Sequence, residues 1–141
     1  MRPKIRNSRP RGALAVSLFA GVFGLVTIVA AAGVLFIDGA WRQMMGGYVG
    51  FVVGFNFLAG FAYVAAAVGL ALWRPWVGPL ALGIAAATAF VALAFAVHVW
   101  MGGAFEWRTV GALAFRALFW LGVAFAVGAA GRGKGALGGA R

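Results

Sequence analysis

Four long apolar segments separated by short polar breaks make up most of the chain. They cover residues 13–37, 46–72, 76–101 and 107–129, and Arg116 is the one charged residue deep inside any of them. An α-helix rises about 1.5 Å per residue, so some 20 apolar residues are enough to cross the hydrocarbon core of a bilayer. The pattern predicts four transmembrane helices.

The breaks between the apolar segments are too short to form domains of their own. Pro75 lies in the second break and Gly102-Gly103 in the third. Because each break is short, the two segments on either side of it must run antiparallel. We therefore expect an all-α fold, an up-down bundle of four transmembrane helices over residues 13–130. A basic tail, residues 1–12, precedes the bundle, and a Gly-rich basic tail, residues 131–141, follows it.

The charges are distributed unevenly between the two predicted membrane faces. An even number of spans places both tails on one side, and the opposite side carries Arg42 and Arg108 against Asp38 and Glu106. The positive-inside rule then predicts cytoplasmic N- and C-termini. Because Arg far outnumbers Lys in an Ala/Gly-rich chain, we expect a bacterial inner membrane, cytoplasmic or intracytoplasmic. Nine basic residues lie on the side of the tails: Arg2, Lys4, Arg6, Arg9, Arg11, Arg74, Arg132, Lys134 and Arg141.

Composition narrows the chemistry that the protein can perform. Hydrophobic residues make up 65% of the chain and charged residues 10%, which is too few to cover the surface of a water-soluble domain. The chain has no cysteine, one histidine and two acids. Thiol chemistry is therefore excluded, and a catalytic site built from paired acids or from a Ser-His-Asp triad is not favoured. The basic residues form no soluble basic face, so no nucleic-acid partner is expected. Whether the protein is an enzyme stays open, with the negative answer favoured and no catalytic residue assigned.

An intramembrane arginine is the main functional candidate. Arg116 lies nine residues into the fourth segment, about 13 Å deep, where a charge is costly and must face a polar partner. Asn56 and Thr88 reach similar depths, and we predict that the three form one buried polar cluster, with Trp120 in position for a cation–π contact. Two interpretations stay open: neighbouring oxygens solvate Arg116, or an anion comes from a lipid, a quinone, another ligand or a partner subunit.

Small residues predict where the helices meet. In lipid, helices associate by close packing at glycine and alanine, and Gly46, Gly50 and Gly54 recur at a spacing of four, with Gly21 and Gly24 in the first segment. Contact within the bundle is the favoured interpretation. The alternative is an interface with another subunit.

A second group of residues is expected at the outer edge of the membrane. His98, Glu106 and Asp38 belong to it, and thioether plus imidazole ligands suit copper or haem iron. Without a repeated ligand motif, interfacial packing is the preferred interpretation, and no cofactor is predicted, with quinone, haem and copper as minor alternatives. The minor metal alternative would use His98, Met101, Met44 and Met45.

The segment Gly102-Gly103-Ala104-Phe105-Glu106 resembles the Gly-Gly-aromatic-Glu connection of DoxX-like proteins, which are small four-helix bacterial membrane proteins. The expected topology is also similar. This resemblance implies a quinone-linked or accessory membrane role in which Glu106 is the residue carried over.

Three functions are consistent with these observations. The favoured one is a non-catalytic membrane subunit that docks onto and stabilises a larger bacterial membrane complex, respiratory or photosynthetic. The alternatives are a homo-oligomeric carrier or channel for an anion or small solute, and a DoxX-like quinone-linked protein. Membrane lipids are expected partners in each case.

Overall fold

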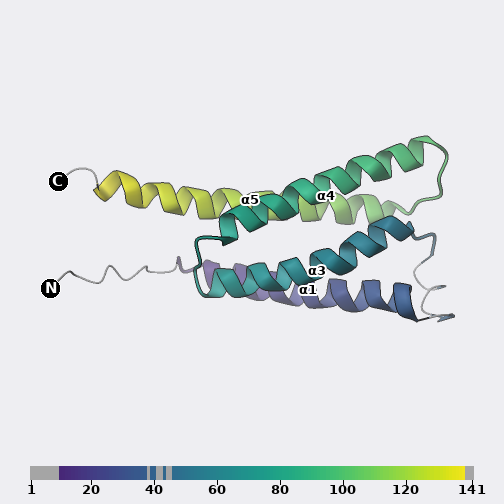
Figure 1. Cartoon of the computed structure of the whole chain (residues 1–141), viewed down its shortest axis with the longest axis horizontal. Helices are drawn as coiled ribbons and strands as arrows, with labels where there is room; N and C mark the ends of the chain where they lie inside the picture. Colours follow the sequence, from purple (N-terminus) through teal and green to yellow (C-terminus); the bar gives the residue numbers. More distant parts are fainter. Residues whose placement is uncertain (1–9, 38, 41–42, 44–45, 139–141) are drawn as a thin grey trace.

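The described part of the chain forms four helices arranged lengthwise (Figure 1). The computed structural model describes residues 10–37, 39–40, 43 and 46–138. Within these residues α1 covers Ala13–Phe36, α3 Gly50–Ala71, α4 Val77–Trp100 and α5 Trp107–Gly138. No strand occurs in these ranges, so the prediction of an all-helical fold is confirmed.

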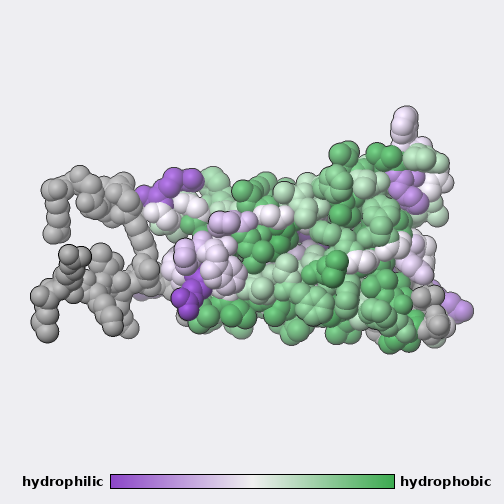
Figure 2. All heavy atoms as spheres, viewed as in Figure 1, coloured by the Kyte–Doolittle hydropathy of each residue, from purple (hydrophilic) through white to green (hydrophobic). Residues whose placement is uncertain are grey.

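Each of the four helices is long and apolar enough to cross a membrane. Figure 2 shows the hydrophobic residues over the middle of the molecule and the hydrophilic residues toward its two ends. The start of α1, the α3–α4 turn and the end of α5 lie at one end, which we call the terminal end (Figure 1). The other end, with the α1–α3 and α4–α5 links, is called the distal end.

Two helix boundaries differ from the prediction by several residues. α3 begins at Gly50, not at residue 46, because Gly46 adopts a φ of +68° and Val49 is still extended. α5 does not end at residue 129 but continues through the glycines to Gly138. No proline in that stretch removes a backbone donor, so the helical hydrogen bonds continue despite the poor helix propensity of glycine.

The helices form two antiparallel pairs, α1 with α3 and α4 with α5. The pairs meet through α3 and α4, whereas α1 and α5 make no close backbone contact in the described part of the chain. A cleft therefore lies between α1 and α5 along one side of the bundle. Two pockets occupy it, one toward each end.

The α1–α3 pair is held by close backbone approach. A Cβ atom on Gly24 would stand 3.0 Å from the carbonyl oxygen of Gly60, and one on Gly60 would stand 2.5 Å from the Ile28 side chain. Nearby, the buried Ser17 hydroxyl donates a hydrogen bond of 2.7 Å to the carbonyl oxygen of Ala67 on α3. Small residues thus bring two backbones together and one interhelical hydrogen bond adds to the contact.

A tight turn joins the two pairs at the terminal end. Trp73 has a φ of +51°, the Trp73 amide donates to the Leu70 carbonyl, and the Arg74 amide donates to the Gly69 carbonyl. This is the Schellman arrangement that ends many helices, with tryptophan at the position that glycine usually takes. Since a Cβ on Gly69 would collide with Trp76 and Val77, the glycine lets α4 return directly against α3.

The main core lies around two aromatic side chains. Tyr63 and Trp120 are 0% exposed, and their ring centroids are 5.0 Å apart. A smaller cluster toward the distal end contains Val49, Val52, Phe95 and Leu113. The two clusters join the α1–α3 pair to the α4–α5 pair.

Candidate functional site

The distal half of the cleft contains an open pocket of about 240 Å³. One wall is α1, another is α3 with the residues just before it, and the third is the first half of α5. Alanine and valine side chains form much of the lining. The polar and charged lining residues are Thr27, Tyr48, Asn56, Glu106, Arg108, Thr109 and Arg116.

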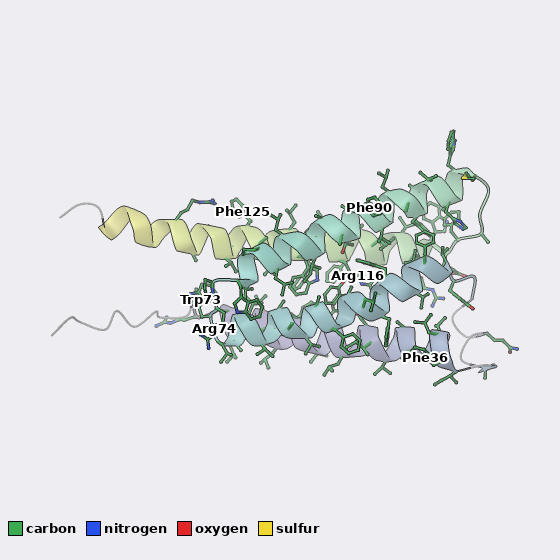
Figure 3. All side chains as sticks on the ribbon, in the orientation of Figure 1. Phe36, Trp73, Arg74, Phe90, Arg116 and Phe125 are labelled. Atoms are coloured by element: carbon green, nitrogen blue, oxygen red, sulfur yellow. The ribbon has the colours of Figure 1, made fainter. Side chains whose placement is uncertain are left out.

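Arg116 lies at the deep end of this distal pocket, between the two helix pairs (Figure 3). Its guanidinium carbon is 5.3 Å from the centroid of the Phe23 ring, a cation–π distance. Its Nε is buried and has no hydrogen-bond partner, and the buried Oδ1 of Asn56 has none either. The pocket therefore holds a cation, an unused donor and an unused acceptor.

The sequence predicts that Asn56, Thr88 and Arg116 form one polar cluster, and Asn56 and Arg116 both line the distal pocket. Thr88 does not line the pocket. It is 0% exposed, and its hydroxyl donates to the Ile84 carbonyl of its own helix at 2.8 Å. The cation–π partner expected at Trp120 is instead Phe23, because Trp120 turns toward Tyr63.

Tyr63 is a member of the cluster that the sequence analysis missed. Its hydroxyl lies among Thr88, Trp120 and Arg116, yet neither this oxygen nor the Trp120 Nε1 makes a hydrogen bond that meets normal geometry. Tyr63 follows Asn56 by seven residues, which is two helical turns and the same helix face. That spacing was the signal available in the sequence.

Glu106 joins the two links at the mouth of the pocket. Its Oε1 accepts a hydrogen bond of 3.2 Å from the Gly47 amide, and its Oε2 lies 3.9 Å from the Arg108 Nε. A Cβ on Gly46 would stand 2.5 Å from the same Oε1, so a side chain there would displace the carboxylate, and the φ of +68° favours glycine at this position. The Glu106 carboxylate is thus engaged at the mouth, far along α5 from Arg116.

The segment Gly102-Gly103-Ala104-Phe105-Glu106, for which a resemblance to DoxX-like proteins was expected, forms the link between α4 and α5. Gly102 has a φ of +84°, and the Gly103 amide donates to the His98 carbonyl, so the pair terminates the helix. A Cβ on Gly103 would collide with the His98 ring. Both glycines therefore have a structural explanation in this turn.

The residues weighed as metal ligands do not assemble in the described part of the chain. The His98 Nε2 lies 3.2 Å from the Ala104 carbonyl, and Met101 is 79% exposed. No group of three His, Cys, Asp or Glu side chains with metal-binding geometry occurs among the described residues. Asp38, Met44 and Met45 lie outside them.

The glycines weighed as packing positions fall into two groups. Gly24 packs against α3, and a Cβ on Gly21 would be 3.5 Å from the Ala67 Cβ. Gly50 and Gly54 have open space where a Cβ would stand, so packing within this bundle does not explain their spacing. A contact with another subunit stays a prediction for these two positions.

Four phenylalanines connect α1 and α5 next to Arg116, which is in contact with one of them, Phe23. Phe19 and Phe23 of α1 contact Phe115 and Phe119 of α5, with ring centroids 5.2–6.3 Å apart across the cleft. We call these four residues the phenylalanine bridge. It separates the distal pocket from the second pocket at the terminal end.

The groups in the distal pocket suit binding more than catalysis. A guanidinium offers up to five N–H donors in a planar fork that matches a carboxylate or a phosphate. Hydroxyl and amide groups surround it, and the lining acid, Glu106, is held at the mouth. The arrangement can accept one anionic group with an apolar body.

Comparison with protein-family models, with curated proteins and with solved structures finds no match. The class defined by the fold is a four-helix protein with spans long enough for a membrane, and the function has to be argued from the site.

Proposed function

We propose that the protein is a small, non-catalytic integral membrane subunit that docks onto a larger membrane complex by receiving a partner's carboxylate at Arg116. The observation that carries this proposal is the guanidinium in the distal pocket with an unpaired Nε.

The charge balance of the chain supports a partner from outside. The only acids are Asp38 and Glu106, both in the links, and Glu106 already binds the Gly47 amide. A central arginine costs about 2.5–3.5 kcal/mol to place in a membrane, and one cation–π contact offsets about 2 kcal/mol at most. A buried carboxylate would offset the rest and would hold the two proteins together.

The shape of the cleft supports a partner that approaches within the membrane plane. α1 and α5 do not close on each other, so the distal pocket opens between them. Much of its wall consists of small apolar side chains, including Ala30, Ala31 and Ala112. A transmembrane helix that carries one acid among apolar residues matches this surface.

The test is to extract tagged protein in mild detergent and to identify co-migrating proteins by blue-native separation and mass spectrometry. We expect a stoichiometric membrane subunit with an acid inside a transmembrane segment. Arg116→Leu should reduce its recovery at least tenfold, since about 1.4 kcal/mol of lost affinity is enough for that factor. Arg74→Leu, an exposed arginine at the terminal end, is the control and should leave recovery unchanged.

The proposal fails if the wild-type protein migrates alone, or if Arg116→Leu retains the partner. Thermal unfolding of both variants in the same detergent excludes misfolding as the reason for a loss. A partner recovered equally with both variants would show docking by another surface.

A binding site for a small anion or a quinone is the second candidate, favoured by the polar lining that runs from Arg116 to Arg108 near the distal end. The phenylalanine bridge lies between this pocket and the second one along the cleft, which supports a binding site over an open channel. If the wild-type protein migrates alone, titration with phosphate, acetate and a water-soluble quinone, followed by flux in proteoliposomes, distinguishes a carrier from a quinone-linked protein.

For orientation, we propose that both termini are cytoplasmic in a bacterial inner membrane, from the charge bias of the sequence. A reporter that is active only outside the cytoplasm should be active when fused after Gly47 and inactive when fused at the C-terminus. The reverse pattern would overturn this orientation.

A further inference from the structure

The terminal half of the cleft contains the second pocket, which we call the terminal groove. It has a volume of about 580 Å³ and is lined by the start of α1, the end of α3 and the second half of α5. Every lining side chain is apolar or aromatic, and small residues form much of the α5 wall: Gly122, Ala126 and Ala130. The polar residues that line the distal pocket do not extend into this groove.

The terminal groove and the distal pocket lie on one continuous face of α5. Residues that line the two pockets recur along this helix at alternating spacings of three and four, which keeps their side chains on a single face. We call this series the α5 seam. Its members are Ala112, Arg116, Phe119, Val123, Ala126 and Ala130.

α1 presents a matching face across the cleft. Its pocket-lining residues follow the same spacing, and Ala20 and Phe23 occupy the two positions between the pockets, so that a second series forms the α1 seam. Its members are Val16, Ala20, Phe23, Thr27, Ala30 and Val34.

This spacing of three and four is the pattern by which one helix receives the side chains of another. Within the described residues, however, the backbones of α1 and α5 make no close contact with each other, and rings of the phenylalanine bridge connect the two helices. Both seams are therefore available to a further helix on either side of the bridge. Lipid tails require no such regular spacing, whereas a helix does.

We propose that a single transmembrane helix of the partner lies along the whole cleft, so that the terminal groove is the second half of the docking surface that begins at Arg116. This inference rests on the docking function proposed for Arg116. Charge complementarity places an acid of the helix at Arg116, which is itself a member of the α5 seam. Alanine at Ala30, Ala112 and Ala126 lets the backbone of the incoming helix approach, as in other contacts between membrane helices.

The cleft also specifies the order of residues along the partner helix. Its acid lies at the depth of Arg116, small residues are needed where the phenylalanine bridge fills the cleft, and bulky apolar residues follow in the terminal groove. Val123 lies seven residues beyond Arg116, about 10 Å along the helix axis. The first bulky residue is therefore expected about two helical turns from the acid.

The main test is photo-crosslinking from single cysteines in a chain that has none of its own. Ala30→Cys in the distal pocket and Ala126→Cys in the terminal groove each carry a benzophenone probe. Ala114→Cys is the control, because Ala114 is exposed, lines neither pocket and is two residues from Ala112, on the opposite side of α5. After illumination of native membranes, mass spectrometry should find one partner helix attached at positions 30 and 126, and no attachment of that helix at position 114.

A matched pair of leucine variants provides a second measurement. Ala126→Leu and Ala114→Leu place the same side chain at exposed positions of α5, but only the first fills the groove. Ala126→Leu should lower recovery of the partner in mild detergent by about fivefold or more, because the extra side chain is forced into the contact. Ala114→Leu should leave recovery unchanged, and equal thermal unfolding of the two variants shows that both are folded.

The outcomes separate this inference from the proposed function. If the partner is attached at position 30 alone, or if Ala126→Leu retains it while Arg116→Leu loses it, docking at Arg116 stands and the full-length helix is wrong. A lipid or a different protein attached at position 126 would overturn the inference in the same way. A wild-type protein that migrates alone, with no partner attached at either position, would overturn both.

Discussion

The α1–α3 contact and the α1–α5 cleft show two ways in which one helix meets its neighbours in a membrane. Toward α3, α1 presents Gly24 and Ser17, and the backbones approach until a Cβ atom would not fit. Toward α5 it presents Phe19 and Phe23, whose rings hold the two helices apart. The same helix therefore makes a closed interface on one face and a ligand-sized opening on the other, according to the size of the side chains.

The difference explains why the pockets lie where they do. Two helices in contact at glycine leave no space between them for a ligand. Two helices in contact through large rings leave space on either side of the rings along the helix axes. The phenylalanine bridge lies between the distal pocket and the second pocket, which is toward the terminal end. It follows that substitutions in the closed interface should affect stability, and substitutions in the bridge should affect the pockets as well.

The largest effect is expected from Gly60→Val. A Cβ there would meet the Ile28 side chain and the Gly24 carbonyl oxygen, so α1 and α3 must separate. Overpacking of this kind costs about 3 kcal/mol of unfolding free energy. Reversible unfolding in mixed micelles, followed by circular dichroism, measures it. Gly54→Val on the same helix, in open space, should cost less than about 1 kcal/mol, and equal losses would contradict the close contact.

A smaller loss is expected from Phe23→Leu. The substitution removes the cation–π contact with Arg116 and the stacking on Tyr63, which together are worth about 1–2 kcal/mol. Because the chain has no cysteine, a pair introduced at Ala30 and Ala112 can carry spin labels across the distal pocket. We expect a broader distance distribution in the variant. The control is Phe125→Leu, since Phe125 is 70% exposed and points away from the bundle (Figure 3).

Ser17→Ala should cost about 0.6–1.7 kcal/mol, the range found for interhelical hydrogen bonds in membranes. It removes the bond to the Ala67 carbonyl and leaves the cleft unchanged. Combined with Phe23→Leu, the two losses in unfolding free energy should add to within about 0.5 kcal/mol, because the residues face different neighbours. A larger coupling would show that the closed interface and the cleft are one unit.

The smallest effect is expected from Glu106→Gln, at most about 0.5 kcal/mol, since the pair with Arg108 is solvent-exposed. The amide retains an oxygen for the Gly47 amide and loses the charge attraction. Unfolding at low and at high salt should show a difference between wild type and variant only at low salt. A difference that persists at high salt would assign Glu106 a buried role.

The fold was predictable because transmembrane helices leave a strong signal in a single sequence. The helix starts at Ala13 and Trp107 are predicted to the residue, because charge or polar breaks precede them. The end of α5 was not predicted correctly. The glycines after residue 129 are typical of a tail, and only the backbone geometry shows that the helix continues.

The site was predictable in part. Arg116 and Asn56 are conspicuous because polar residues are rare inside the apolar segments, and their depths agree. Tyr63 and the phenylalanine bridge were not recognised, because an aromatic residue in an apolar segment can face either the lipid or the protein interior. The choice between lipid and cleft depends on helix rotation, which periodicity does not set in segments that are apolar all round.

Arg116 also sets an order of events during biogenesis. α5 follows α1 and α3 in the chain, so it leaves the ribosome after them, and it carries Arg116, the one charged residue deep inside the four apolar segments. The groups that stabilise this charge, the Phe23 ring and the walls of the distal pocket, belong to α1 and α3. Synthesis in chain order thus makes the α1–α3 hairpin available before α5, and its side chains can take the place of water around the arginine.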